Sequence, residues 1–297
     1  MLSGLCAFPL TPLNNGQVDE ESFARIMARL TAAGVDSLGI LGSTGSYAYL
    51  TRQQRQRVIE LTRQLAGDIP LMAGIGSVSS DEILRLAEDA QQAGANAFLL
   101  SVICYQSLRD EEVYRLFETV TQQVSIPICV YDNPSTTHFR YSDQLLRQLS
   151  SLPQVRSVKI PGIPGDHGTV TQRINQLRSQ LRPGTVIGIS GDAFAASGLI
   201  AGCDVWYSVC GGLFPHISKQ ITRAAAVGDA QQVTALSARL EPLWALFRKH
   251  GSSLRVISAA AGILGLTPPD NLPRPLLPLP ESDLAEIAAV IEQLELE

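Results

Sequence analysis

The stretch VRSVKIPG, residues 155–162, decides the fold, because it reads as a short buried strand that carries a lysine near its end. Lysine is among the residues least often buried without a partner, and only three of the 23 basic residues of this chain are lysines. Strand alternation divides the side chains between two faces, with Val155, Ser157 and Lys159 on one and Val158 and Ile160 on the other. The proline and glycine that follow end the strand. Lys159 is therefore expected at the carboxyl end of a strand, where a buried charge needs a specific use.

Short apolar runs of the same kind recur roughly every 20 to 30 residues along the chain. They predict strands at residues 2–8, 37–41, 71–75, 97–102, 126–131, 155–160, 185–189 and 205–209. Amphipathic helical patterns fill the intervals, as in the apolar stripe between Phe23 and Leu30. Two of these helices open with the spacing of a capping box, at 51–54 and at 79–82. The alternation of strand and helix predicts βαβ units.

Eight such units within residues 1–228 favour an α/β fold of the (β/α)8 TIM-barrel type, whose typical length is about 250 residues. A doubly wound sheet is the alternative, but it would need a glycine-rich fingerprint after the first strand, and FPLTP at 8–12 offers none. Beyond the barrel the pattern is only helical. We interpret residues 229–297 as a C-terminal helical extension of the same domain. Its expected helices are 229–250, 252–264 and 281–295, with a proline-rich crossing at 267–282.

Composition and charge indicate which kinds of molecule this protein binds. A formal net charge of -5, a pI near 5.5 and the lack of any cluster of basic residues argue against nucleic acid and membrane surfaces, so we expect a small-molecule substrate. The start of the chain has no leader pattern, and no apolar run approaches the ~20 residues that span a bilayer, which predicts a cytoplasmic protein. The five cysteines are scattered without ligand spacing, which favours reduced core thiols over a metal site.

The active site of such a barrel is built at the carboxyl ends of its strands. On that rule, Lys159 at the end of the sixth strand lies beside Tyr131 at the end of the fifth. The second strand runs into GSTGS at 42–46, and the seventh runs into SGD at 190–192. These four features are therefore expected on one rim of the barrel.

Together these groups favour Schiff-base chemistry on a 2-oxo acid. Only a neutral lysine amine attacks a carbonyl, and burial in an apolar barrel favours the neutral form of an amine. A neighbouring tyrosine can move protons to and from the carbinolamine oxygen. Hydroxyls and backbone N–H groups of a glycine-rich loop can hold the substrate carboxylate.

Each feature alone also has an ordinary structural explanation. A lysine at a strand end can be ion-paired or can extend to solvent, and a tyrosine there can be a packed aromatic with a satisfied hydroxyl. GSTGS could be a turn with helix-capping side chains, and it lacks the lysine of a phosphate-binding loop. The four histidines show no convergence on the rim, so we assign them no role.

Several motifs match a known family in order and spacing. They are FPLTP at 8–12, GSTGSYAYLT at 42–51, YDNP at 131–134, the lysine of SVKIPG, and SGD at 190–192. With them, the chain resembles the dihydrodipicolinate synthase and N-acetylneuraminate lyase superfamily over nearly its whole length. The resemblance implies a homotetramer, arranged as a dimer of dimers, of class I aldolase type. Such an enzyme uses pyruvate or a related 2-oxo acid through a lysine Schiff base, without metal or organic cofactor.

The resemblance also implies roles for individual residues. The catalytic group would comprise Lys159 as the Schiff-base lysine, Tyr131 as the general acid and base, and Ser43 and Tyr105 as members of a hydroxyl relay. Tyr105 would act in the site of the neighbouring subunit. The substrate-binding group would comprise Thr44 at the pyruvate carboxylate, Gly191 in a pocket-lining loop, Tyr207 near the carbonyl contact on the last strand, and Thr136.

Thr136 marks the main departure from the synthases. There the segment after the tyrosine reads YNVPSRT, and its arginine binds the carboxylate of aspartate semialdehyde. Here it reads YDNPSTT, so a hydroxyl replaces a bidentate guanidinium and an acidic second substrate would be poorly held at this position. Two further departures are Ser46 and Ile160, which stand where glutamates are common in the family.

Three hypotheses follow for the function. The first is a lyase of aldolase or dehydratase type that acts on pyruvate or a 2-oxo-3-deoxy sugar acid. The second is a 4-hydroxy-tetrahydrodipicolinate synthase that takes a replacement arginine from elsewhere, such as Arg140. The third is a non-catalytic protein that binds a small oxo acid, although a mere binder has no need of a neutral amine.

Overall fold

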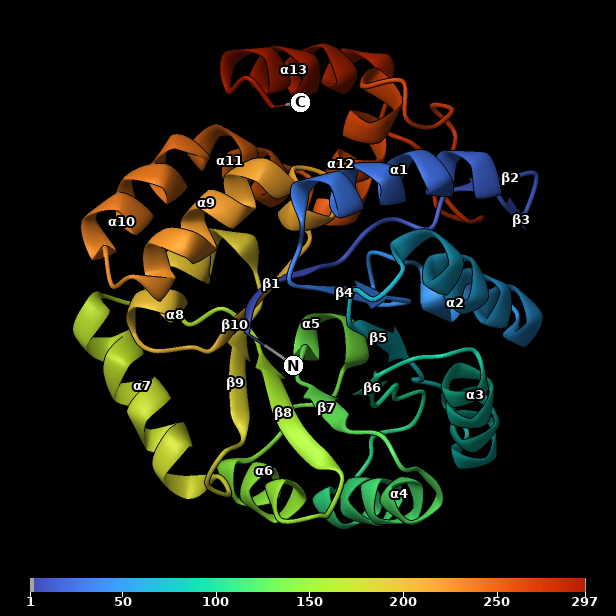
Figure 1. Cartoon of the computed structure of the whole chain (residues 1–297), viewed down its shortest axis with the longest axis vertical. Helices are drawn as coiled ribbons and strands as arrows, with labels where there is room; N and C mark the ends of the chain where they lie inside the picture. The colour runs from blue at the N-terminus through green and yellow to red at the C-terminus, as the bar shows by residue number, and fades with distance from the viewer. Residues whose placement is uncertain (1–2, 297) are drawn as a thin grey trace.

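The computed structural model of the protein describes residues 3–296. Within them, eight parallel strands close into a barrel in the order β1-β10-β9-β8-β7-β6-β5-β4 (Figure 1). These strands are β1 (Gly4–Ala7), β4 (Ser37–Ile40), β5 (Leu71–Gly74), β6 (Ala97–Ser101), β7 (Ile128–Tyr131), β8 (Val155–Ile160), β9 (Val186–Ile189) and β10 (Val205–Ser208). The predicted (β/α)8 barrel is thus confirmed. The first strand was expected from residue 2, which lies outside the described residues.

Helices surround the barrel as an outer ring (Figure 1). The ring contains α1 (Glu20–Ala33), α2 (Arg52–Ala66), α3 (Ser80–Gln92), α4 (Asp110–Gln123), α6 (Asp143–Ser150), α7 (His167–Gln180), α8 (Ala195–Ile200) and α9 (Pro215–Ala226). Shorter turns of helix lie in the connections, at α5 (Pro134–Thr137), η1 (Tyr47–Tyr49), η2 (Asp192–Phe194) and η3 (Cys210–Gly212). The apolar stripe of α1, from Phe23 to Leu30, is buried against the strands, as its periodicity predicts.

The helix starts differ in how they are capped. Thr51 forms the predicted capping box with Gln54 at the start of α2. The box predicted at the start of α3 is wrong, since the Ser79 side chain makes no capping hydrogen bond. The Glu82 carboxylate instead pairs with Arg85 at 3.0 Å, one turn along the helix. Correct spacing therefore permits a capping box but does not ensure one, because the glutamate has another partner within reach.

A small hairpin precedes the first helix and was not predicted. It joins β2 (Leu13–Asn14) to β3 (Gln17–Val18) in antiparallel register. Its two turn residues, Asn15 and Gly16, both have positive φ, at 49° and 75°. Asn-Gly is the strongest short-range signal for such a turn, so this hairpin could have been predicted from the sequence.

The alternation predicted for β8 fails at its first residue. Val155 pairs with Ile128, whereas the next pair joins Ser157 to Cys129, so Arg156 is skipped in the register. This bulge turns Val155 outward into the layer between strands and helices. The rest of the strand alternates as predicted, which brings Lys159 into register with Tyr131 on β7.

Aromatic side chains fill the barrel interior. Phe8, Tyr131 and Tyr207 belong to its buried cluster. Glycines on the neighbouring strands make room for two of these rings. A Cβ on Gly39 would lie 2.3 Å from the ring of Phe8, and one on Gly188 would lie 2.2 Å from the ring of Tyr207. The packing around the rim lysine thus depends on two positions that accept no side chain.

The C-terminal helices lie together at one side of the ring, with the last of them outermost (Figure 1). They are α10 (Ala230–Arg239), α11 (Glu241–Lys249), α12 (Ser253–Ile263) and α13 (Glu281–Gln293). The single helix predicted over 229–250 is wrong, because Leu240 separates two helices. Pro242 lies in the first turn of the second helix, where its missing N–H costs no helical hydrogen bond. None of the described helices is long and apolar enough to cross a membrane.

Candidate active site

Lys159 is buried at the end of β8 and faces three aromatic rings. The residue is only 5% exposed to solvent. The Nζ atom lies 3.9 Å from the ring centroid of Phe8, 4.8 Å from that of Tyr131 and 5.5 Å from that of Tyr207. Among residues 3–296 the ammonium makes no ion pair and no hydrogen bond. The ion-paired and solvent-directed explanations therefore do not apply within the described chain, and the cation is held by ring faces.

Tyr131 places its hydroxyl in a short polar network beside this lysine. The hydroxyl hydrogen-bonds to Ser43 Oγ at 3.1 Å and accepts a hydrogen bond from Asn133 Nδ2 at 2.9 Å. Burial by itself raises the pKa of Tyr131, but the positive charge of Lys159 and these hydrogen bonds lower it overall. A phenol with a lowered pKa exchanges protons more readily near neutral pH. Asn133, which lies two residues after the strand, was not expected in this role.

The loop after β4 brings Ser43 and Thr44 to the same rim, as predicted. Ser43 reaches Tyr131, whereas Thr44 is only 3% exposed and lines the cavity beside it. A second tyrosine joins this wall. The Tyr47 hydroxyl lies 2.7 Å from Ser101 Oγ in a buried hydrogen bond, and burial raises the pKa of Tyr47 to about 12. A phenol of that kind stays neutral, so Tyr131 is the better proton carrier of the two.

Tyr105 does not reach the site of its own chain. The residue follows β6 and is 91% exposed. A tyrosine that acts in a neighbouring subunit would have to project from the surface in this way. Its role in a relay therefore stays a prediction that depends on assembly.

The loop after β9 is fixed by a buried carboxylate. Asp192 accepts hydrogen bonds from Trp206 Nε1 at 3.0 Å, Ser208 Oγ at 3.0 Å and the Cys210 backbone N–H at 2.7 Å. Burial raises the pKa of Asp192 against the opposing effect of these donors. The anchored loop holds Gly191, with φ of 80°, at the wall of the lysine-containing cavity. The SGD motif thus positions the backbone of the loop.

Tyr207 directs its hydroxyl into the barrel and away from the loops. It lies 2.7 Å from Ser157 Oγ and 3.5 Å from Cys129 Sγ, both buried. Tyr207 also lines the lysine cavity, and its ring lies 5.5 Å from Lys159 Nζ. Tyr207 therefore lies at the lysine cavity on the last strand, where the sequence placed it, with its hydroxyl hydrogen-bonded inside the barrel.

Two adjoining cavities open at this rim, each of about 410 Å³, which suits a small molecule. The lysine cavity is lined by Tyr131, Lys159, Gly191, Tyr207 and others, including Trp244 and Phe247 from α11. The hydroxyl cavity has both apolar and polar lining, and its polar residues include Thr44, Tyr47, Ser135, Thr136, Ser252 and Arg255. Both are bordered by Ser43, Asn133, Gly251 and Ser253. The walls from α11 and α12 were not predicted, because these helices carry no motif.

Thr136 and Arg140 differ in their access to these cavities. Thr136 lines the hydroxyl cavity, and its Oγ1 donates to the Asn133 carbonyl at 3.3 Å. Arg140 is exposed and lines neither cavity. The arginine absent from position 136 is therefore not replaced by Arg140.

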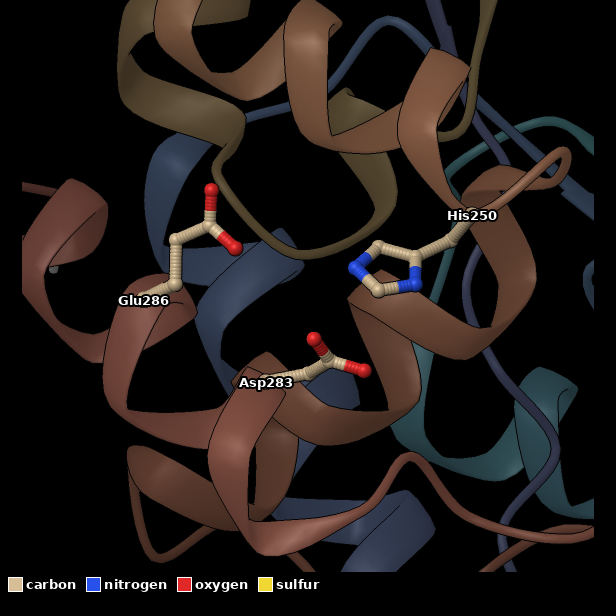
Figure 2. A group of neighbouring side chains, drawn as sticks. All are labelled: His250, Asp283 and Glu286. Atoms are coloured by element: carbon tan, nitrogen blue, oxygen red, sulfur yellow. The ribbon is translucent and has the colours of Figure 1, made fainter.

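A group of potential metal ligands lies away from the rim, where α11 meets α13. His250, Asp283 and Glu286 each offer an atom within 4.8 Å of the others (Figure 2). Lys249 already compensates the two carboxylates, with Nζ 3.2 Å from Asp283 and in contact with Glu286. Their separation along the sequence gave no ligand spacing to detect. Because an ammonium group occupies the carboxylates, we assign this cluster an ion-pairing role.

Asp132, next to Tyr131, makes the stability of the folded protein depend on pH. Burial raises its pKa from 3.8 to about 6 against the opposing charges of Arg140 and Arg173, and its Oδ1 has no partner among the described residues. The native state thus holds this proton more tightly than the unfolded chain. The associated stability is complete below about pH 4 and is lost as the pH rises through 6.

The free energy of unfolding of Asp132→Asn, relative to that of the native chain, is therefore expected to rise by about 1 kcal/mol between pH 5 and pH 8. Urea unfolding of both proteins at the two pH values measures this difference. Asp143→Asn is the control, because a hydrogen bond from Arg173 lowers the pKa of Asp143 and its carboxylate stays ionised in both states over this range, so its difference from the native chain should not change between pH 5 and pH 8. A difference for Asp132→Asn that does not change with pH would contradict the expectation.

A closed (β/α)8 barrel with an unpaired lysine and a tyrosine at its rim defines the class of lysine-dependent aldolase-type lyases. The model of the dihydrodipicolinate synthetase family matches residues 1–294, so the chain belongs to that family. It is 31% identical to the 4-hydroxy-tetrahydrodipicolinate synthase of Bartonella bacilliformis over 98% of each chain. It is also 31% identical to that of Nitrobacter hamburgensis over 91% of this chain and 89% of the relative.

Solved structures agree with this assignment. The crystal structure of a dihydrodipicolinate synthase from Agrobacterium tumefaciens superposes with a TM-score of 0.94 at 45% identity, over 99% of this chain and 98% of the other. The resemblance to the superfamily is thus confirmed. The chain is an enzyme, a lyase of class I aldolase type, and the hypothesis of a non-catalytic binding protein is dropped.

Proposed function

We propose that this enzyme forms a Schiff base between Lys159 and the 2-oxo group of its substrate, which is pyruvate or a 2-oxo-3-deoxy sugar acid. The sugar acid is then cleaved or dehydrated. The observation that carries the proposal is the unpaired, buried Lys159 ammonium within 4.8 Å of the ring of Tyr131. The rings and the low exposure keep bulk water from the amine, and no carboxylate of the described chain forms an ion pair with its Nζ. No ion pair or hydrogen bond within residues 3–296 accounts for the burial of this lysine.

The chemistry can be followed through the same residues. The neutral amine adds to C2 of the oxo acid, Tyr131 transfers protons to and from the oxygen of the carbinolamine, and water leaves to give an iminium ion. In cleavage, a base takes the proton of the 4-hydroxyl group, and the electrons of the C3–C4 bond move to the iminium nitrogen. An aldehyde leaves, the enamine is protonated at C3, and hydrolysis releases pyruvate and free Lys159. In dehydration, loss of a C3 proton gives an enamine, the 4-hydroxyl group takes up a proton and leaves as water, and hydrolysis of the unsaturated iminium releases the product and free Lys159.

The neighbouring residues are proposed to support these steps. Ser43 passes protons to Tyr131, Thr44 and the backbone of Gly191 hold the substrate carboxylate, and the ring of Tyr207 packs beside the bound oxo acid. Thr136 contacts the half of the substrate beyond the carbonyl. These roles rest on position at one cavity or the other and on the family resemblance.

Assembly and organisation are part of the same proposal. Tyr105 would complete the relay in a neighbouring copy, which requires at least a dimer and fits a homotetramer. Residues 229–297 would belong to the barrel domain as its extension, since α11 and α12 wall the cavities. The five cysteines are free, and four of them are buried, which suits a reducing cytoplasm.

A 4-hydroxy-tetrahydrodipicolinate synthase is the second candidate, because curated relatives carry that name. Against it stand the hydroxyl of Thr136 in place of an arginine and the position of Arg140 outside both cavities. Assay of condensation between pyruvate and aspartate semialdehyde separates the candidates. Turnover comparable to that of an authentic synthase would overturn our preference.

Borohydride reduction in the presence of pyruvate tests the shared chemistry. Mass spectrometry of the digested protein is expected to show a reduced adduct on the peptide that carries Lys159. No adduct with pyruvate or with other 2-oxo acids would overturn the proposal. A screen of 2-oxo-3-deoxy sugar acids for pyruvate release or for loss of water then identifies the reaction.

A further inference from the structure

An arginine of the C-terminal extension lines the hydroxyl cavity without a partner. Arg255 lies in the first turn of α12 and is half-buried. Its guanidinium makes no hydrogen bond or ion pair with any residue in the range 3–296. Other arginines of this chain, such as Arg52 and Arg173, are held by carboxylates at two nitrogen atoms. A half-buried guanidinium left open to a cavity is therefore available to a ligand.

The surroundings leave this positive charge uncompensated. Arg255 is the one charged residue among those described at the wall of the hydroxyl cavity. In the adjoining lysine cavity, the carboxylate of Asp192 is already occupied by three donors. The other arginine there, Arg248, is paired with Glu241. The joined cavities thus present two unpaired cations, Lys159 and Arg255, and no unpaired carboxylate among the described residues.

The two cations line different cavities, which share part of their walls. Lys159 borders the lysine cavity, Arg255 borders the hydroxyl cavity, and Ser43, Asn133 and Ser253 border both. A substrate fixed at C2 by Lys159 must extend its chain past these shared residues. Their hydroxyl and amide groups suit the hydroxyl groups of a sugar acid, and the guanidinium of the second cavity suits an anionic group of a substrate that extends into it.

We propose that Arg255 binds a second, terminal carboxylate of the substrate, so that the enzyme acts on a dicarboxylic 2-oxo-3-deoxy sugar acid. This inference rests on the function proposed above and specifies its substrate class. The planar fork of a guanidinium matches a carboxylate with two parallel hydrogen bonds. The positive charge missing at Thr136 would then be supplied from α12, at a different place and for a longer substrate.

Borohydride trapping with matched pairs of simple 2-oxo acids tests the proposal. The probes are 2-oxoglutarate against 2-oxopentanoate and 2-oxoadipate against 2-oxohexanoate, with pyruvate as the common reference. In at least one pair, the diacid is expected to reach half-maximal trapping at a concentration about 10- to 100-fold lower than the monoacid. Arg255→Gln should abolish that preference, expressed relative to pyruvate trapping by the same variant, while Arg255→Lys should restore part of it.

Arg140→Gln is the matched control, because it removes an exposed arginine that lines neither cavity. It is expected to keep the full preference for the diacid. A wild-type enzyme with no preference in either pair, or a preference that survives Arg255→Gln, would overturn the inference while the Schiff-base function stands. Failure to trap pyruvate itself would overturn the proposed function and this inference with it.

Discussion

Replacing Lys159 with arginine is expected to lower kcat by at least about 10⁴-fold and to eliminate the borohydride adduct with pyruvate. Arginine keeps the positive charge but is always protonated in proteins, so it cannot attack a carbonyl. The new side chain borders a cavity of about 410 Å³, and no ion pair of Lys159 within the described chain is lost. The fold should therefore survive. Steady-state kinetics, mass spectrometry and thermal unfolding by circular dichroism measure these effects.

Lys219→Arg is the matched control for this substitution. Lys219 is also buried, at 8% exposure, but its Nζ is paired with Asp36 at 2.6 Å and it lies outside both cavities. Arginine can keep that ion pair, so activity and trapping should stay close to those of the native enzyme. Retained activity in Lys159→Arg, or an adduct on another lysine, would show that the nucleophile is misassigned.

Tyr131→Phe is expected to lower kcat by about 10²- to 10⁴-fold, the range typical of losing a general acid or base. The change removes only the hydroxyl that Ser43 and Asn133 hold beside Lys159. Because the amine remains, trapping with pyruvate should persist at a lower rate. The pH profile of kcat should also lose the ionisation contributed by this phenol, whose pKa is lowered in the native enzyme.

Tyr141→Phe controls for the loss of a buried hydroxyl as such. The Tyr141 hydroxyl has no hydrogen-bond partner among the described residues, and its residue lines neither cavity. Kinetics of this variant should match those of the native enzyme. A Tyr131→Phe variant with native kcat would exclude the proton-transfer role of Tyr131.

Local sequence patterns predicted much of the barrel. They failed where the same pattern is compatible with two different local structures. The apolar runs placed the strands correctly because burial on both faces imposes a continuous apolar composition. The bulge at Arg156 has no such signature, so the prediction that Val155 shares a face with Ser157 and Lys159 was wrong. The break at Leu240 was missed although Pro242 marks it, because proline is also tolerated in the first turn of a helix.

The sequence by itself determined the βα order, the strand ends that carry Lys159 and Tyr131, and the loss of an arginine at position 136. Each of these follows from residue type and short-range periodicity. Only the tertiary structure decided that Lys159 lacks an ion pair within the described chain and that Arg255 reaches the same wall of cavities. Ion pairing and cavity lining depend on which segments meet although they lie far apart along the chain. That meeting is set by barrel closure and by packing of the C-terminal helices on the rim, which no local pattern contains.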